Sequence, residues 1–242
     1  MVVWTSYVTS CMSFDVIDEL HGALSALGFV NWTRSTKSAI WVLHEHGDIW
    51  HWVGATVARR GDRWVIAPNA GLYNPWVSRT ETRLSANDDR LAGRAPTLCH
   101  PIARFDPERP ASYAAPAALV GECCRKIADV WRFIARPAFA AEASLDQMYD
   151  CLVAGRLCEA VPLESRLVRR MALACLLRRA ADVERVSEEI RAMVGDGDKD
   201  GSYGGYYLAV VERAAQLVGV ANPQDVVEKL VQRDLRALRS LG

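Results

Sequence analysis

The chain has 242 residues, half of them hydrophobic, with 29 basic and 29 acidic residues and an isoelectric point near 7.0. This length and composition support a substantial hydrophobic core, in one large domain or in two small ones. A chain without net charge has no overall field that would hold nucleic acid or an anionic membrane surface, so neither is an expected partner.

The seven cysteines form an odd set without a C-x-x-C pair, and most of them lie in segments rich in Ala, Leu and Arg. This pattern is typical of reduced core thiols. The first residues lack the basic start of a secretory signal, and no apolar run approaches the roughly 18 residues of a membrane span. These features together predict a cytoplasmic protein.

The first predicted element is a helix within residues 13–29, where hydrophobic residues recur with helical spacing. Ser13 can cap its start. Gly28 stands where a left-handed glycine ends a helix, and Phe29 can fold back onto the last turn.

Three segments with strand composition follow, at residues 38–46, 49–60 and 63–69. Gly-Asp pairs at 47–48 and 61–62 separate them, which predicts an antiparallel meander of hairpins. The sequence NAGLYNPW is expected to end this sheet. Residues 78–100 are polar, and their sequence assigns them no element.

The composition changes near residue 112. Seven of the eight tryptophans lie before residue 77, and all five histidines lie at or before residue 100. The remainder is rich in Ala, Leu, Arg and Glu, so we expect an α+β fold: an α+β domain with an antiparallel sheet over residues 1–112 and a helical domain over residues 113–242. The proline-containing segment Ile102–Pro116 is the predicted connection.

Helices in the second half are predicted at residues 117–135, at 144–154, after Pro162, at 182–194, at 206–218 and from Asn222 onward. The first of them is expected to stop before Arg136 and Pro137, because proline lacks the amide hydrogen that a helix interior needs.

The sequence VLHEHGDIWHW, at residues 42–52, concentrates three histidines around a predicted turn. If residues 47–48 form a two-residue turn, His46 faces Ile49, Glu45 faces Trp50, and His44 faces His51. Alternation along the strands would then place all three histidines on one face, within reach of a single ion.

Two interpretations of this stretch remain open. His44, His46 and His51 could bind zinc in a small metal-dependent hydrolase, with Glu45 or Asp48 as the base. Alternatively, the hairpin presents a solvated polar face and the protein has no cofactor. The spacing H-E-H-G-D-I-W-H differs from the H-x-H-x-D-H of metallo-β-lactamase-like hydrolases, and His100 is the sole later histidine, so membership of that family is rejected.

The sequence DGDKDG, which begins at Asp196, matches the first half of a calcium-binding EF-hand loop. Asp196, Asp198 and Asp200 would supply the first ligands. The twelfth position, which should carry a bidentate glutamate, is Tyr207. The stretch is therefore either a weak calcium site or an acidic linker.

No phosphate-binding loop and no G-x-S-x-G motif occurs in the sequence. Tryptophans at strand spacing are typical of a core, but aromatic side chains also anchor protein interfaces. Trp50, Trp52 and Trp76 are the candidate interface residues.

Several short motifs resemble an uncharacterised bacterial domain family of unknown function. They are the LGF that ends the first helix, VNWTR at residues 30–34, APNAGLYNPW at 67–76 and RRMALACLLRRAADVERVSEEI at 169–190. The resemblance covers roughly Phe14 to Ile190 and implies an N-terminal helix, a meander sheet and trailing helices. The chain departs from the family in the middle strand, where HEHGD replaces a polar Q-x-S element.

The family has no established catalytic residues, and similar domains occur among bacterial immunity and interaction proteins. We therefore expect a non-enzymatic, cytoplasmic bacterial protein that binds another protein, of the immunity or antitoxin type. The metal-dependent hydrolase is the alternative, and a helical regulatory scaffold is a third interpretation. The two main hypotheses differ in whether the histidines converge on one concave site.

Overall fold

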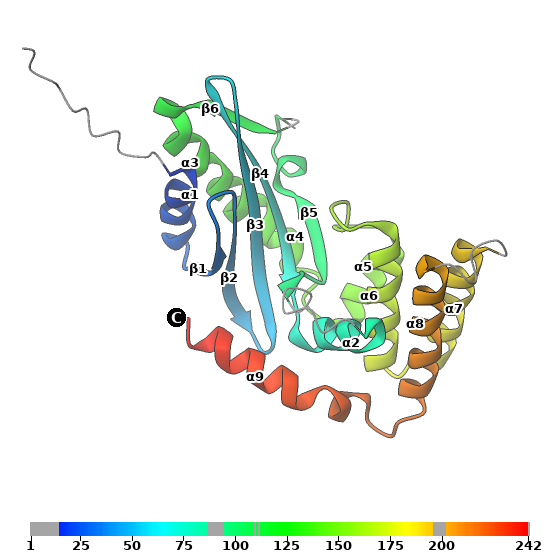
Figure 1. The fold of residues 1–242 in the computed structure, drawn as a ribbon. Coiled ribbons are helices and arrows are strands. Elements are labelled where there is room, and N and C mark those ends of the chain that lie inside the picture. The colour runs from blue at the N-terminus through cyan, green and yellow to red at the C-terminus, as the bar shows by residue number, and fades with distance from the viewer. Residues whose placement is uncertain (1–14, 87–93, 109, 111, 196–201, 242) are drawn as a thin grey trace, which may run out of the picture.

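The structure is a computed structural model that describes residues 15–86, 94–108, 110, 112–195 and 202–241. It has the predicted α+β architecture, in which an N-terminal helix and an antiparallel meander precede a mostly helical part (Figure 1). In the part of the chain that the structure describes, no helix has both the length and the apolar character that crossing a membrane requires.

The first helix, α1 (Val16–Ser25), is capped by Asp15, whose carboxylate accepts a backbone N–H of the first turn. The predicted cap, Ser13, lies outside the described residues. Gly28 has a φ of +91°, and the N–H of Phe29 returns to a carbonyl in the last turn of the helix, as predicted.

Six strands form one sheet in the order β1-β2-β3-β4-β5, and β6 also pairs with β4. The predicted bounds of β2 and β3 are confirmed, whereas β4 continues to Tyr73, beyond the predicted end at residue 69. The strands are β1 (Val30–Arg34), β2 (Ser38–His46), β3 (Ile49–Arg60), β4 (Arg63–Tyr73), β5 (Leu98–Pro101) and β6 (Tyr113–Pro116).

Helices α1 and α3 lie along one side of the sheet, and α5 to α8 stack beside its other end (Figure 1). Helix α2 lies between the sheet and this stack, and α9 runs back along the base of the molecule towards the β2–β3 hairpin. The helices are α2 (Pro75–Ser85), α3 (Val120–Val130), α4 (Arg136–Ala140), α5 (Leu145–Val153), α6 (Leu163–Leu176), α7 (Ala180–Val194), α8 (Ser202–Val218) and α9 (Glu228–Arg239).

The helix that was expected to end before Arg136 continues instead. Residues Trp131–Ala135 form a π-helical turn between α3 and α4, and the N–H of Arg136 donates to the carbonyl of Trp131, five residues back. Pro137 then falls in the first turn of α4, directly after this wider turn. The wider turn thus accommodates the proline.

One cluster of buried hydrophobic residues extends from α1 through the sheet into α8. Strand β6, which follows the predicted domain boundary at residue 112, pairs with β4. A smaller cluster of Val227, Val231 and Leu235 attaches α9 beside Trp76. The division into domains at residue 112 stays a prediction.

Asp106 links the chain segment between β5 and β6 to α3. Its buried carboxylate accepts hydrogen bonds from the Tyr113 hydroxyl and the Glu108 N–H, both at 3.0 Å, and lies 3.3 Å from Lys126 Nζ. Burial alone would raise the pKa of Asp106, but these hydrogen bonds and the lysine charge outweigh it and lower the pKa below its usual value.

We therefore expect Asp106→Asn to lower the free energy of unfolding by about 1.5–3 kcal/mol near neutral pH. A lowered carboxyl pKa gives stability that is present above the unfolded pKa of about 4 and is lost as the pH falls through the folded pKa. Urea titrations from about pH 7 to pH 3 should thus show the difference between wild type and Asp106→Asn shrinking below about pH 4. Glu108→Gln, which removes the exposed partner of Lys126, is the control and should behave like wild type. A difference that stays constant with pH would contradict this account.

Candidate binding groove

The histidine hairpin has a different register from the predicted one. His46 pairs with Ile49 as expected, but His44 pairs with Trp50, and His51 pairs with Leu43. The register shifts between His44 and His46, so Glu45 is an extra residue in a β-bulge. Because one extra residue changes which residues share a face, His44 and His51 lie on opposite faces of the sheet.

His51 is completely buried, and its Nε2 lies 2.7 Å from the carboxylate of Glu45. Arg136 donates to the same carboxylate at 3.2 Å and lies over the ring of Trp131, which His51 meets edge-on with 5.5 Å between ring centroids. Burial by itself would raise the pKa of Glu45, but Arg136 and His51 together lower it.

These contacts join the hairpin to the π-helical turn, since Glu45 and His51 come from the hairpin and Trp131 and Arg136 from the turn and α4. A completely buried imidazole cannot reach a substrate, so the geometry gives His51 a structural part. His44, in contrast, is exposed. Its Nε2 lies 3.0 Å from the carbonyl of Gly47, and its ring contacts Trp50 in a tilted arrangement.

Within the described ranges, no group of three or more His, Cys, Asp or Glu side chains is arranged to hold a metal ion. Of the three proposed zinc ligands, His44 and His51 are separated by the sheet, and the side chain of His46 lies outside what the structure describes. Asp196, Asp198 and Asp200, the candidate calcium ligands, lie outside the described residues.

The three candidate interface tryptophans differ in their burial. Trp50 and Trp52 are 4% and 8% exposed, so both pack in the core and offer little surface to a partner. The Trp76 indole is half-buried and donates to the carboxylate of Asp48 at 2.8 Å. Because Asp48 lies in the turn of the hairpin and Arg239 of α9 is 3.9 Å away from it, the hairpin end rests against α9.

None of the described cysteines has the features of a nucleophile. All six are free, and five of them are buried. Burial raises the pKa of Cys99 and Cys175 to about 12, so these thiols are protonated at neutral pH. They act as small core residues.

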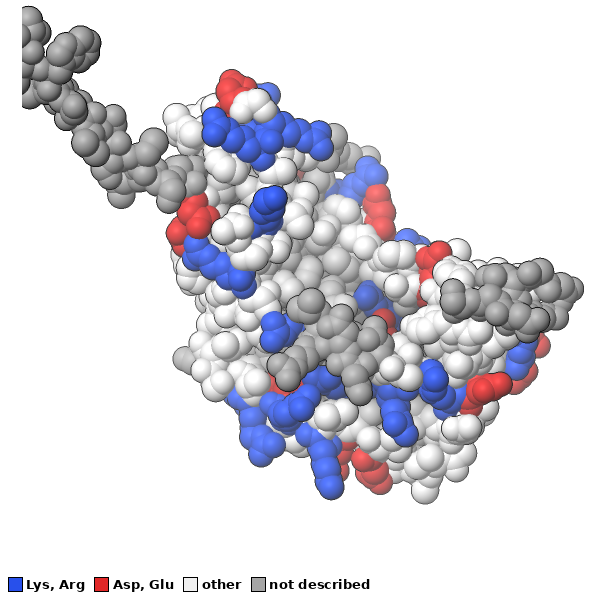
Figure 2. Space-filling view, viewed as in Figure 1, with Lys and Arg blue, Asp and Glu red and all other residues white. Residues whose placement is uncertain are grey.

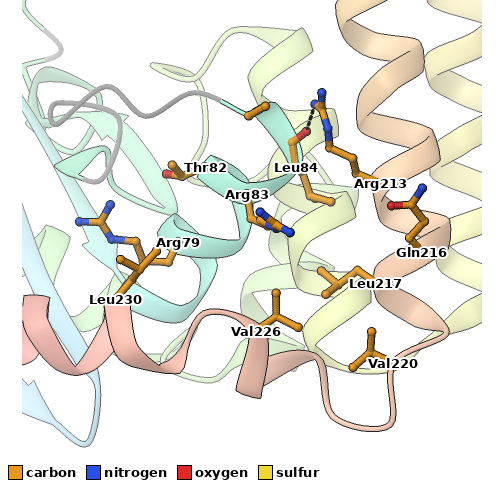
Figure 3. Close-up of a pocket in the computed structure, with 11 residues that line it drawn as sticks. Arg79, Thr82, Arg83, Leu84, Arg213, Gln216, Leu217, Val220, Val226 and Leu230 are labelled. Carbon is orange, nitrogen blue, oxygen red and sulfur yellow. Dashed lines mark hydrogen bonds between the residues drawn. The ribbon is translucent and has the colours of Figure 1, made fainter.

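A groove of ≈ 530 Å³ lies between α2, α8 and the segment formed by a short 3₁₀ helix, η5 (Pro223–Val226), and α9 (Figure 3). We call it the α2–α8–α9 groove. Its α2 wall consists of Arg79, Thr82 and Arg83, with Leu84 beneath and Ala86 at the helix end. The spacing of the first three places them on one face of the helix.

The opposite wall repeats this spacing. Arg213, Gln216 and Leu217 of α8 and then Val220 line the groove at positions i, i+3, i+4 and i+7. Val226 of η5 and Leu230 of α9 close the third side. Val220, Val226 and Leu230 are 39%, 39% and 40% exposed, so the groove has an aliphatic rim that is open to solvent.

One of the three arginines in the groove is neutralised. Arg79 forms a two-bond ion pair with Asp234 of α9, in which Nη2 and Oδ1 are 2.7 Å apart, and the hydrogen bond to this carboxylate raises the Arg79 pKa. Both side chains are mostly buried, at 13% and 12% exposure. This pair links α9 to α2 and so holds these two walls of the groove together.

Among the described residues, the other two arginines have no such partner. Neither Arg83 nor Arg213 forms an ion pair with a carboxylate in the part of the chain that the structure describes. Arg213 Nη1 donates to the carbonyl of Leu84 at 2.7 Å and thereby satisfies the C-terminal end of α2. In Figure 2, blue Lys and Arg atoms predominate over the lower part of the visible face, where Figure 1 shows α2 and α9.

The local sequence explains why α2 forms at this place. Asn74 caps it by accepting the N–H groups of Trp76 and Val77, and Pro75 occupies the first turn. These are the Asn and Pro of NAGLYNPW. The expectation that this sequence ends the sheet is wrong, because its first residues belong to β4 and the later strands β5 and β6 also pair with β4. The hydrophobic spacing along α8 was recognisable in the sequence, whereas the polar helix α2 was missed.

No protein-family model matches the chain, and no curated protein or solved structure matches it.

Proposed function

We propose that this chain is a non-enzymatic, cytoplasmic bacterial protein of the immunity or antitoxin type, which acts by binding another protein at the α2–α8–α9 groove. The observation that carries the proposal is the groove itself. It combines two arginines, Arg83 and Arg213, for which the described residues supply no carboxylate partner, with a rim of three exposed aliphatic side chains.

Arginine is enriched at protein interfaces because its guanidinium combines charge-assisted hydrogen bonds with apolar contacts, and binding energy concentrates where such anchors adjoin apolar pockets. The walls are helices fixed by the Arg79–Asp234 pair and by the contact of Arg213 with the end of α2. A groove with fixed walls binds at a lower entropic cost than a flexible surface.

The buried free thiols support a reducing compartment, and the balanced charge of the chain supports a protein partner over nucleic acid or a membrane. The burial of His51 and its separation from His44 support a binding function over the hydrolase alternative.

The proposal is tested by site-specific photo-crosslinking in a native host. A photoreactive phenylalanine analogue is placed at Val226 or Leu230 in the groove, and at the somewhat more exposed Leu119 and Val153 as controls. We expect a discrete protein adduct from the two groove positions and none from the controls, with the partner identified by mass spectrometry. If the groove positions give no adduct, or the controls give the same one, the chain does not bind a protein at this groove.

A further inference from the structure

The α2–α8–α9 groove divides into a charged side and an aliphatic side. Figure 3 shows Arg83 and Arg213 between α2 and α8, while Val220 and Val226 lie at the opposite margin, near η5. An occupant that satisfies both sides carries carboxylates next to apolar side chains. Charge complementarity thus selects an acidic segment, and the aliphatic rim requires that the segment also be amphipathic.

The shape of the walls favours a helical occupant. Both α2 and α8 present rows at positions i, i+3 and i+4 to the groove, and such rows form the ridges between which a third helix packs. Helix α2 has 11 residues, a length of roughly 16 Å, so a partner helix of about three turns matches it. Helix-in-groove binding uses anchors at this same spacing.

The openness of the groove favours a helical occupant over a small amphiphile such as a fatty acid. Sites for small ligands typically bury about 70–90% of the ligand surface. Here Val220, Val226 and Leu230 each remain about two-fifths exposed, and a small ligand in the groove would leave much of this rim uncovered. A partner helix would cover both the groove and its rim.

We infer that the α2–α8–α9 groove binds an acidic amphipathic α-helix of a partner protein, whose carboxylates pair with Arg83 and Arg213 and whose aliphatic side chains contact Val220, Val226 and Leu230. This inference rests on the proposed function, because it names the class of partner that the groove accepts.

The test uses the full chain as bait for a displayed library of random 16-residue peptides. The recovered peptides are sequenced, and the strongest is labelled with a fluorophore for anisotropy titration. We expect enrichment of Asp and Glu together with Leu and Ile at helical spacing. Affinity should fall as salt is raised, since exposed ion pairs are screened.

Variants then locate the binding site. Arg83→Glu and Leu230→Ser should each weaken the selected peptide at least about tenfold, whereas Arg60→Glu and Leu119→Ser, at exposed positions away from the groove, should leave it unchanged. Arg83→Glu should also bind the same peptide more tightly once lysines replace its acidic residues. Far-UV circular dichroism establishes that each variant is folded.

Three results would overturn the inference: basic or uncharged peptides dominating the selection, acidic peptides binding the groove variants as well as wild type, or dodecanoate binding the groove while no acidic peptide is selected. These results leave the photo-crosslinking experiment unaffected. If crosslinking identifies a partner but the selection yields no acidic peptides, this inference alone is contradicted. If the selection yields acidic peptides but crosslinking identifies no partner, the proposed function is contradicted.

Discussion

Replacing Asp234 with alanine is expected to cost about 3 kcal/mol and to release α9 from the body of the protein. Removing one member of a mostly buried ion pair leaves the other charge uncompensated, which typically costs about 3–5 kcal/mol. Here Arg79 would be left without a carboxylate between α2 and α9. Because the pair is slightly exposed, the lower end of this range applies.

The effect should be concentrated in α9, because Leu238 alone joins it to the main hydrophobic core and its other buried residues form the small cluster of Val227, Val231 and Leu235 beside Trp76. An element with few buried contacts opens locally before the whole protein unfolds. Hydrogen exchange should therefore show faster exchange of α9 amides in Asp234→Ala, with the amides of β3 and β4 unchanged under native conditions. Since Leu230 lies one turn before Asp234, release of α9 would also remove the third wall of the groove.

Two variants make this prediction specific. Glu228→Ala removes an exposed acidic residue of the same helix and should have little effect. The double variant Arg79→Leu/Asp234→Leu replaces the pair with apolar side chains and should recover most of the lost protection, because a buried pair often contributes little over a hydrophobic contact. Protection of α9 that survives in Asp234→Ala would show that the apolar cluster alone holds the helix.

The strands were largely predictable, because their signals are local. Tryptophan, valine and isoleucine runs separated by Gly-Asp turns define β2 and β3, and glycines at 47 and 61 have the positive φ values that such turns require. The bulge at Glu45 was not predictable. Histidines alternate with Glu45 in β2 and with tryptophans in β3, so the hydrophobic pattern does not fix the register. The contacts of His51 with Glu45 and Trp131 favour the observed one.

Helix α2 was missed because its sequence, PWVSRTETRLS, is mostly polar. Ser78, Thr80 and Thr82 are buried all the same, which a reading based on hydrophobic spacing does not anticipate. The groove could not be predicted from the sequence for a further reason. Its walls come from residues 79–86 and 213–230, and no local pattern in one sequence shows that segments so far apart in the chain lie together.

Trp131 is the other position at which a large effect is expected. Its ring is 1% exposed and meets Phe29 edge-on with 4.6 Å between centroids, besides its contact with His51. Truncating a buried tryptophan to alanine typically costs about 3–5 kcal/mol, and edge-on aromatic pairs add about 0.5–1.5 kcal/mol. We therefore expect Trp131→Ala to lower the free energy of unfolding by about 4 kcal/mol or more, which would leave a domain of ordinary stability barely folded.

The π-helical turn supplies a matched control, because Phe133 is two residues further on and 64% exposed. Phe133→Ala should change the free energy of unfolding by no more than about 0.5 kcal/mol, since it removes no buried contact. Urea unfolding followed by far-UV circular dichroism compares the two without relying on tryptophan fluorescence. If the two variants lower the free energy of unfolding equally, the turn itself, rather than the burial of Trp131, joins the hairpin to α3. If only Trp131→Ala lowers it, the role of the wide turn is to orient this indole towards His51 and Phe29.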